Sequence, residues 1–173
     1  LFHIFGQNCI MNASIFAGIT NVLLKRFEPD NVIRLIYKKK VSIFAGVPTM
    51  FWGLLNELKS FDKEKISLLK RHWRIALSGG AAMPVELLND FEKIYQIPIF
   101  EGYGMSEASP LVTYNSPGYK RKIGSVGLPL WGVNVRVVDD QLIEVPNYEV
   151  GQIIFRGHNV MKGYFNNKEA TKK

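Results

Sequence analysis

The residues best suited to chemistry lie in one short segment, Glu101–Pro110. Its first seven positions hold two glycines, the ring of Tyr103, the hydroxyl of Ser106 and two carboxylates. Glycine lets a backbone approach a ligand closely, and an aromatic ring offers a flat face. A serine hydroxyl can hydrogen-bond a phosphate, and Glu107 is the hard oxygen ligand that Mg²⁺ prefers. The segment therefore suits a magnesium nucleotide. The alternative is a glycine-rich turn after a buried strand, with Tyr103 packed and Glu107 solvated.

The same segment resembles the Tyr-Gly-x-Thr/Ser-Glu signature of the adenylate-forming (AMP-binding) superfamily. Three further segments, Leu1–Gly6, Ser78–Pro84 and Gly151–Tyr164, resemble other motifs of that superfamily in the same order. The signature and the last of these segments are most similar to a long- or medium-chain fatty-acid–CoA ligase (an acyl-CoA synthetase). The resemblance implies a central fragment of the large N-terminal domain, which makes a generic α/β domain a poor alternative.

The resemblance also implies a role for each matched residue. Tyr103 would stack on adenine, Gly80 and Ala81 would form the opposite wall, and Gly79 would face the acyl group. Glu101 would lie near the exocyclic amine. The implied ATP/AMP-binding residues are Gly79, Gly80, Ala81, Glu101, Gly102, Tyr103 and Gly104.

Two residues are implied to be catalytic. Ser106 would contact the α-phosphate, and Glu107 would hold Mg²⁺. His3 would form a wall of the substrate pocket beside the carboxylate, and a packed histidine between Phe2 and Phe5 is the alternative. The implied function is ATP-dependent activation of a carboxylic acid, expected to be a fatty acid, to acyl-adenylate and then acyl-CoA. Such a reaction requires two anions to be aligned and phosphate charge to be neutralised.

Two other functions stay open at this stage. One is an amino- or aryl-acid adenylating enzyme that loads a carrier-protein thiol, and the other is a non-catalytic nucleotide-binding module. The family also uses an upstream phosphate loop, a downstream aspartate for the ribose and a lysine on a C-terminal domain, and we find no match for them here. We therefore expect N- and C-terminal portions of the same protein to complete the enzyme, and this chain alone to be inactive.

Composition excludes several classes of partner and site. The 173 residues are 47% apolar and 21% charged, which is ordinary for a globular protein, and the net charge of +7 is dispersed without a nucleic-acid-binding signature. Cys9 is the single cysteine, so no disulfide or cysteine metal site is expected, and a cytoplasmic location fits. The apolar stretch Ile10–Leu24 is interrupted and too short to span a bilayer. A peripheral position at a membrane surface and a homo-oligomer stay open.

Hydrophobic periodicity predicts the elements that must position these residues. Helices are expected at 8–16, 31–39, 49–58 with Thr49 as N-cap, 66–69 and 84–95. Strands are expected at 22–24, 41–45, 74–77 and 97–100. A strand–helix–strand order implies parallel strands, so the segments after Leu77 and Phe100 should leave one sheet edge, where ligands bind in open α/β sheets.

The pattern changes after about Asn115. Alternating Val133, Val135 and Val137 predict a half-exposed strand, and residues 152–155 predict a further strand. The expected fold class is therefore α/β. Residues 1–118 would form a parallel sheet with flanking helices, and residues 119–173 would form part of a small antiparallel β-barrel subdomain.

Overall fold

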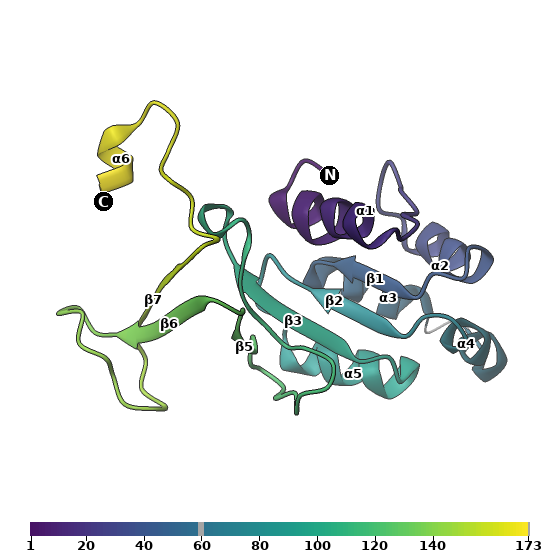
Figure 1. Cartoon of the computed structure of the whole chain (residues 1–173). Coiled ribbons are helices and arrows are strands. Elements are labelled where there is room, and N and C mark those ends of the chain that lie inside the picture. The colour runs from purple at the N-terminus through teal and green to yellow at the C-terminus, as the bar shows by residue number, and fades with distance from the viewer. Residues whose placement is uncertain (59–60, 173) are drawn as a thin grey trace.

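The structure is a computed structural model that describes residues 1–58 and 61–172. A five-stranded sheet in the order β1-β2-β3-β4-β5 forms the centre, and a separate two-stranded sheet, β6-β7, projects beyond β5 (Figure 1). The strands are β1 (Ile43–Gly46), β2 (Ile75–Ser78), β3 (Ile99–Gly104), β4 (Leu111–Tyr114), β5 (Leu128–Pro129), β6 (Val133–Val138) and β7 (Gln152–Gly157). The expected α/β class, with a small antiparallel sheet at its end, is confirmed.

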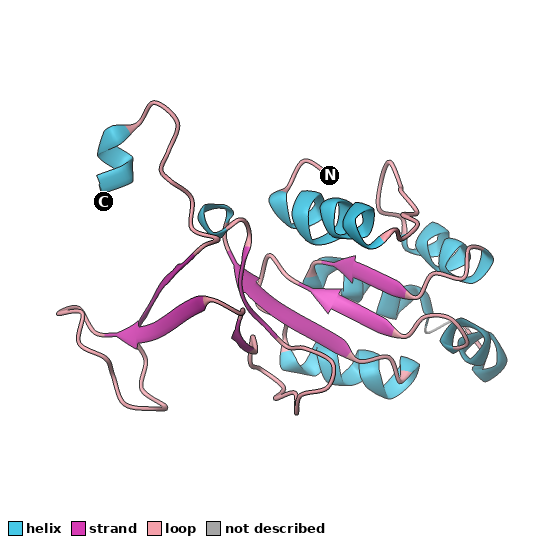
Figure 2. Ribbon diagram, viewed as in Figure 1, coloured by secondary structure: helices cyan, strands magenta, loops and turns pink. Residues whose placement is uncertain are grey.

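Helices cover both faces of the larger sheet. Helix α1 lies along one face, and α3 and α5 lie along the other (Figures 1 and 2). The described helices are the π-helix η1 (Phe5–Asn12), α1 (Ala13–Ala17), α2 (Pro29–Lys38), α3 (Pro48–Leu58), α4 (Lys63–Lys70), α5 (Val85–Tyr95), the 3-10 helix η2 (Ser106–Ala108) and α6 (Lys168–Lys172). None of them is long and apolar enough to cross a bilayer.

The sheet is parallel at one side and antiparallel at the other. Strands β1, β2 and β3 run parallel, as the strand–helix–strand order predicts, and Ser78 pairs with Glu101. Strand β4 then runs antiparallel to β3 and pairs with its backbone as far as Gly104. The prediction that β3 ends at Phe100 is therefore wrong, because Glu101–Gly104 are strand residues rather than a loop.

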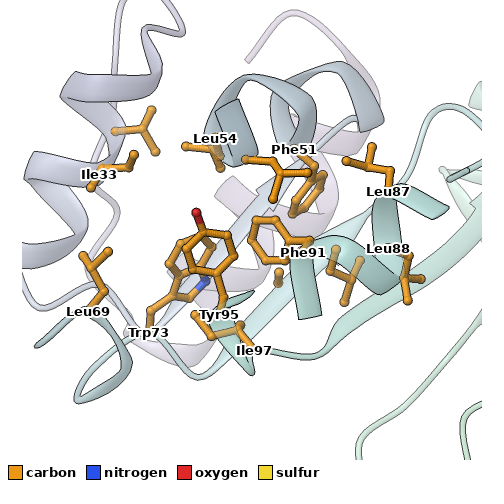
Figure 3. Packing of buried hydrophobic residues seen from close by; sticks show 14 of the residues in the cluster. Ile33, Phe51, Leu54, Leu69, Trp73, Leu87, Leu88, Phe91, Tyr95 and Ile97 are labelled. Atoms are coloured by element: carbon orange, nitrogen blue, oxygen red, sulfur yellow. The ribbon is translucent and has the colours of Figure 1, made fainter. Parts of the chain in front are cut away.

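Aromatic packing holds the parallel strands against α3 and α5. Figure 3 shows Phe91 at the centre, with its ring 5.3 Å from Phe51, 5.7 Å from Trp73 and 4.5 Å from Tyr95 between centroids. These four side chains are at most 1% exposed. Ring edges packed on ring faces add to the gain from burial. The core therefore fixes α5 against the sheet and holds the ends of β2 and β3.

Several helix boundaries differ from the predictions. Helix α3 begins at Pro48, and the carbonyl of Val47 accepts from the N–H groups of Met50 and Phe51. Thr49 therefore lies inside the first turn and is not the N-cap, because proline, which lacks an N–H, suits the first helical position. Helix α4 is longer than predicted because Asp62 caps it, accepting from the Lys65 N–H at 2.8 Å.

Two predictions near the N-terminus need correction. The helix expected at 8–16 begins earlier, as η1, and continues as α1 to Ala17. The strand expected at 22–24 does not form, and Val22, Leu23 and Leu24 are exposed. An apolar run becomes a strand only when another strand supplies its hydrogen bonds, and no described strand lies beside this one.

Candidate functional site

A cavity of about 590 Å³ lies between the N-terminal segment and the carboxyl ends of β2 and β3. It brings together seven of the ten predicted site residues, from three separate segments of the sequence. They are His3, Gly79, Gly80, Gly102, Gly104, Ser106 and Glu107. Ile4, Phe5, Cys9, Leu77, Ser78, Met105, Pro110, Leu111 and Tyr114 complete the lining. Ala81, Glu101 and Tyr103 do not line this cavity.

The pleat of β3 accounts for Glu101, Gly102 and Tyr103 in this division. A register shift against β4 follows Tyr103, and Gly104 still lines the cavity, while Ala81 lies on the loop after β2. Successive residues of a strand point to opposite faces. Gly102 and Gly104 face the cavity, and a side chain at either position would collide with β4 or the turn before it. An added Cβ would lie 2.9 Å from Leu111 Cδ1 at Gly102 and 1.8 Å from the Pro110 carbonyl oxygen at Gly104. Glycine at both positions therefore allows the β3–β4 pairing and leaves the cavity open.

The other face of β3 presents polar groups. Glu101 is buried, and its carboxylate accepts a hydrogen bond from the Met83 N–H of the loop after β2. Burial raises the pKa of Glu101, although that hydrogen bond and the charge of Arg121 oppose the rise. Ser78, paired with Glu101, is also buried, and its Oγ has no hydrogen-bond partner within the described chain. The half-buried Tyr103 packs toward Val112.

An ion pair fixes the start of β3. The Arg121 guanidinium donates to both carboxylate oxygens of Glu92, at 2.5 and 2.6 Å, and also to the Ile99 carbonyl. Glu92 in turn accepts from the Ile99 N–H at 2.7 Å. In a bidentate, charge-assisted pair of this kind, two parallel hydrogen bonds fix the relative orientation of the two side chains. Arg121 therefore ties the segment before β5 to α5 and to the first residue of β3.

Ser106 and Glu107 lie on η2, at the rim of the cavity. The Tyr164 hydroxyl donates to Glu107 Oε1 at 2.7 Å, and this hydrogen bond lowers the pKa of Glu107. No group of three or more His, Cys, Asp or Glu side chains in residues 1–58 and 61–172 could hold a metal ion. Mg²⁺ commonly takes one or two protein carboxylates and completes its shell with water and substrate phosphates. A single ionised carboxylate at this rim fits that pattern.

The N-terminal segment lines the side of the cavity that faces β2 and β3. His3 is exposed, lines the cavity, and accepts at Nδ1 from the Phe5 N–H at 3.2 Å. The Phe5 ring lies over Gly79, where an added Cβ would be 3.5 Å away. Asn8 donates through Nδ2 to the Ser109 carbonyl at 2.5 Å, which joins η1 to the turn after η2. Burial raises the pKa of the nearby Cys9 thiol.

Sequence reasoning missed several residues of the site. Phe5, Leu111 and Tyr114 line the cavity without having been assigned to it, and Tyr164 contacts Glu107. The β-branched and aromatic run Leu111–Tyr114 was a strand signal that could have been found. The Tyr164 contact had no local signal, since the two residues are 57 positions apart.

The mixed sheet has a cavity on one face of β3 and buried polar groups on the other, and both sides meet at η2. This arrangement is typical of α/β proteins that bind small molecules. Residues 1–165 match the AMP-binding enzyme family, so the chain belongs to that family.

Three known proteins illustrate the similarity. The chain is 39% identical to a long-chain-fatty-acid–CoA ligase of Bacillus subtilis (strain 168), over 98% of this chain and 30% of the ligase. The ATP-bound RpMatB-BxBclM chimera B3 superposes with a TM-score of 0.87 at 30% identity, over 98% of this chain and 32% of the chimera. The anthranilate CoA ligase AuaEII, solved with anthranoyl-AMP, gives a TM-score of 0.87 at 26% identity, over 99% and 33%. This chain thus spans about a third of each relative.

Proposed function

We propose that this chain is the acid- and adenine-binding part of an enzyme that activates a carboxylic acid with ATP and transfers the acyl group to coenzyme A. The observation that carries the proposal is the geometry of β3. One face of this strand borders an apolar cavity, the other bears Glu101 and Tyr103, and the strand leads into Ser106 and Glu107. An acid and a nucleotide held on the two faces would meet at that turn.

The cavity suits an acid with a large apolar group. Its volume of about 590 Å³ lies within the usual range for small-molecule pockets, and most of its lining is apolar. We propose a fatty acid, in line with the 39% identity to the Bacillus subtilis ligase. An aryl acid is the second candidate, because Phe5 and Tyr114 offer aromatic walls and AuaEII was solved with anthranoyl-AMP.

The nucleotide would lie on the side of Glu101 and Tyr103. The half-buried Tyr103 ring offers a stacking face for adenine, with Gly80 and Ala81 as the facing wall. The Glu101 carboxylate, already held by the Met83 N–H, would lie near the exocyclic amine. Ser78 pairs with Glu101 and also lines the cavity, and its buried Oγ has no partner in the described chain. Since buried hydroxyls normally find a partner, this Oγ supports a polar ligand group where the two sides meet.

Activation joins the carboxylate oxygen to the α-phosphorus and releases pyrophosphate. The thiol of coenzyme A then attacks the acyl carbon and AMP leaves. Ser106 would hydrogen-bond the α-phosphate, and Glu107 would hold Mg²⁺, which when bound neutralises phosphate charge. His3 and the Phe5 ring would confine the acid carboxylate at the cavity mouth. The chain itself supplies alignment, so no covalent enzyme intermediate is needed.

The test is acid-dependent exchange of labelled pyrophosphate into ATP by the full-length protein, across fatty, aryl and amino acids. We expect exchange with fatty acids, and a loss of at least about 100-fold in Glu107→Gln, the usual effect of removing one group that stabilises developing charge. The matched control is Glu149→Gln, at an exposed glutamate between β6 and β7, which should leave the rate unchanged.

The outcomes separate the candidates. Exchange with aryl acids alone would select the second candidate. Comparing coenzyme A with a pantetheinylated carrier protein as acceptor would separate a CoA ligase from a carrier-loading enzyme. A folded protein that gives no exchange with any acid would overturn the proposal in favour of a nucleotide-binding module.

A further inference from the structure

The segment that follows β7 crosses the η2 turn and is bonded to it. Figure 1 shows this yellow segment passing η2 before it reaches α6. Asn159 Nδ2 donates to the Leu111 carbonyl at 2.7 Å, and the Met161 N–H donates to the Glu107 carbonyl at 2.8 Å. The Tyr164 hydroxyl then donates to Glu107 Oε1 at 2.7 Å. Both the backbone and the side chain of Glu107 are therefore held by residues more than 50 positions away.

Tyr164 is itself held in place. Its backbone N–H donates to Thr171 Oγ1 at 3.0 Å, and the Thr171 hydroxyl donates to the Asn167 carbonyl at 2.8 Å. Gly163 before it has φ of +150°, and an added Cβ there would lie 2.6 Å from Thr171 Cγ2. This left-handed conformation and close approach favour glycine. The turn that places the Tyr164 ring next to Glu107 is thus held by its hydrogen bond to Thr171 of α6.

Glu107 is a half-buried residue of a three-residue 3-10 helix, and its carboxylate accepts hydrogen bonds from the Tyr164 hydroxyl and from its own backbone N–H. Without the Tyr164 bond, the rotatable bonds of the side chain would regain conformational entropy and its direction would be less well fixed. An O–H donor to an ionised carboxylate forms a strong, directional hydrogen bond. The Tyr164 hydroxyl and Glu107 Oε1 are 2.7 Å apart, which is a typical O–H···O hydrogen-bond distance. The phenol hydroxyl donates to Oε1 of Glu107 and does not neutralise the carboxylate.

We propose that Tyr164 is a positioning residue that aims the Glu107 carboxylate at the cation of a metal–nucleotide complex. This inference rests on the proposed function, in which Glu107 holds Mg²⁺. Carboxylates that bind metals are commonly oriented by a hydrogen bond from a second residue, and loss of that residue weakens metal binding. The segment 157–164 thereby contributes to the nucleotide site from outside the cavity that residues 3–114 line.

The experiment measures metal-dependent nucleotide binding by the full-length protein. Isothermal titration calorimetry gives the Kd of α,β-methylene-ATP with saturating Mn²⁺ and again with excess EDTA. The Kd in EDTA divided by the Kd in Mn²⁺ measures how strongly the metal tightens nucleotide binding. In Tyr164→Phe, which removes only the hydroxyl, we expect this ratio to fall about 10-fold while the Kd in EDTA is unchanged. Tyr148→Phe, at a fully exposed tyrosine, is the matched control and should keep the wild-type ratio.

Glu107→Gln separates failure of this inference from failure of the proposed function. If the ratio collapses in Glu107→Gln but stays at the wild-type value in Tyr164→Phe, Glu107 keeps its metal role and only the positioning role of Tyr164 is overturned. A ratio unchanged in Glu107→Gln would overturn both. Tighter metal-dependent binding in Tyr164→Phe would mean that the phenol competes with the cation. Equal weakening with Mn²⁺ and EDTA would mean a structural role alone.

Discussion

At the scale of single residues, the missing side chain of Gly79 contributes to the volume of the cavity. Gly79 is buried beneath the Phe5 ring, and an added Cβ would make ordinary contact at 3.5 Å. The site can therefore accept a methyl group there without a clash, in contrast to Gly104, where the Pro110 carbonyl blocks any Cβ. Gly79 is thus a position at which cavity size can be changed while the fold is kept.

For Gly79→Ala we expect kcat/KM to fall about 10-fold for the bulkiest acid accepted by the full-length protein and to change little for the smallest, because a pocket discriminates one carbon by roughly this factor. Gly6→Ala is the matched control, since its added Cβ would meet only Leu1 at 3.6 Å. Steady-state kinetics over a series of acid lengths provides the measurement. An equal loss for every acid would contradict the role of Gly79 in acid size.

At the residue scale, a sequence motif predicted which residues lie together. Gly79, Gly102, Ser106 and Glu107 were expected at one site, and the structure places them around one cavity, while their roles stay predictions. It failed where a contact joins distant segments with no shared pattern, as in the bond from Tyr164 to Glu107. Such contacts depend on how the chain after β7 turns back toward η2, which no local periodicity specifies.

At the scale of elements, the α5 helix links the core to the site. Phe91 on its buried face contacts aromatic rings from α3, from the segment just before β2 and from α5 itself. Glu92, the next residue, holds Arg121 and the first residue of β3. The same helix therefore packs the sheet and fixes the strand that divides the two ligand sides.

Phe91→Ala should destabilise the protein by about 4 kcal/mol, since deleting a fully buried ring removes its burial and leaves a cavity. Urea denaturation followed by tryptophan fluorescence measures the change, because Trp73 lies against Phe91. Phe165→Ala is the control, as that ring is 93% exposed and its loss should cost less than about 0.5 kcal/mol. Similar losses in both variants would argue against the packing described here.

Element prediction was strongest where amphipathic periodicity and strand–helix alternation agree. The helices at α2 and α5 and the parallel strands β1, β2 and β3 were all expected, with ends shifted by a few residues. The strand at 22–24 failed because apolar composition cannot supply a pairing partner. The end of β3 was misplaced because the antiparallel partner β4, which lengthens it, lies later in the sequence.

At the scale of the whole molecule, the core beneath the larger sheet is well buried, whereas several large apolar side chains of the described chain are almost fully exposed. They include Phe2, Phe16, Trp131 and Phe165, each more than 90% exposed. The division at residue 118 stays a prediction.

We propose that the 173-residue chain on its own does not activate acids. Only one carboxylate, Glu107, lies at the rim of the described cavity, and the resemblance implies further phosphate and ribose contacts from other parts of the protein. Purified chain 1–173, shown to be folded by circular dichroism, should give no pyrophosphate exchange under conditions in which the full-length protein is active. Acyl-adenylate formed by the purified chain would contradict this expectation.

The alternation of β3 has a consequence for how such a protein diversifies. Gly102 and Gly104 face the cavity, whereas Glu101 and Tyr103 project to the opposite face. Gly102 and Gly104 must stay glycine because an added Cβ would collide with Leu111 or the Pro110 carbonyl, but Leu111 and Tyr114 also line the cavity. Under the proposed function, substitutions at Leu111 or Tyr114 would change which acid fits and leave Glu101 and Tyr103 unchanged. The pleat of a single six-residue strand would then let natural selection act on acid specificity and on nucleotide binding separately.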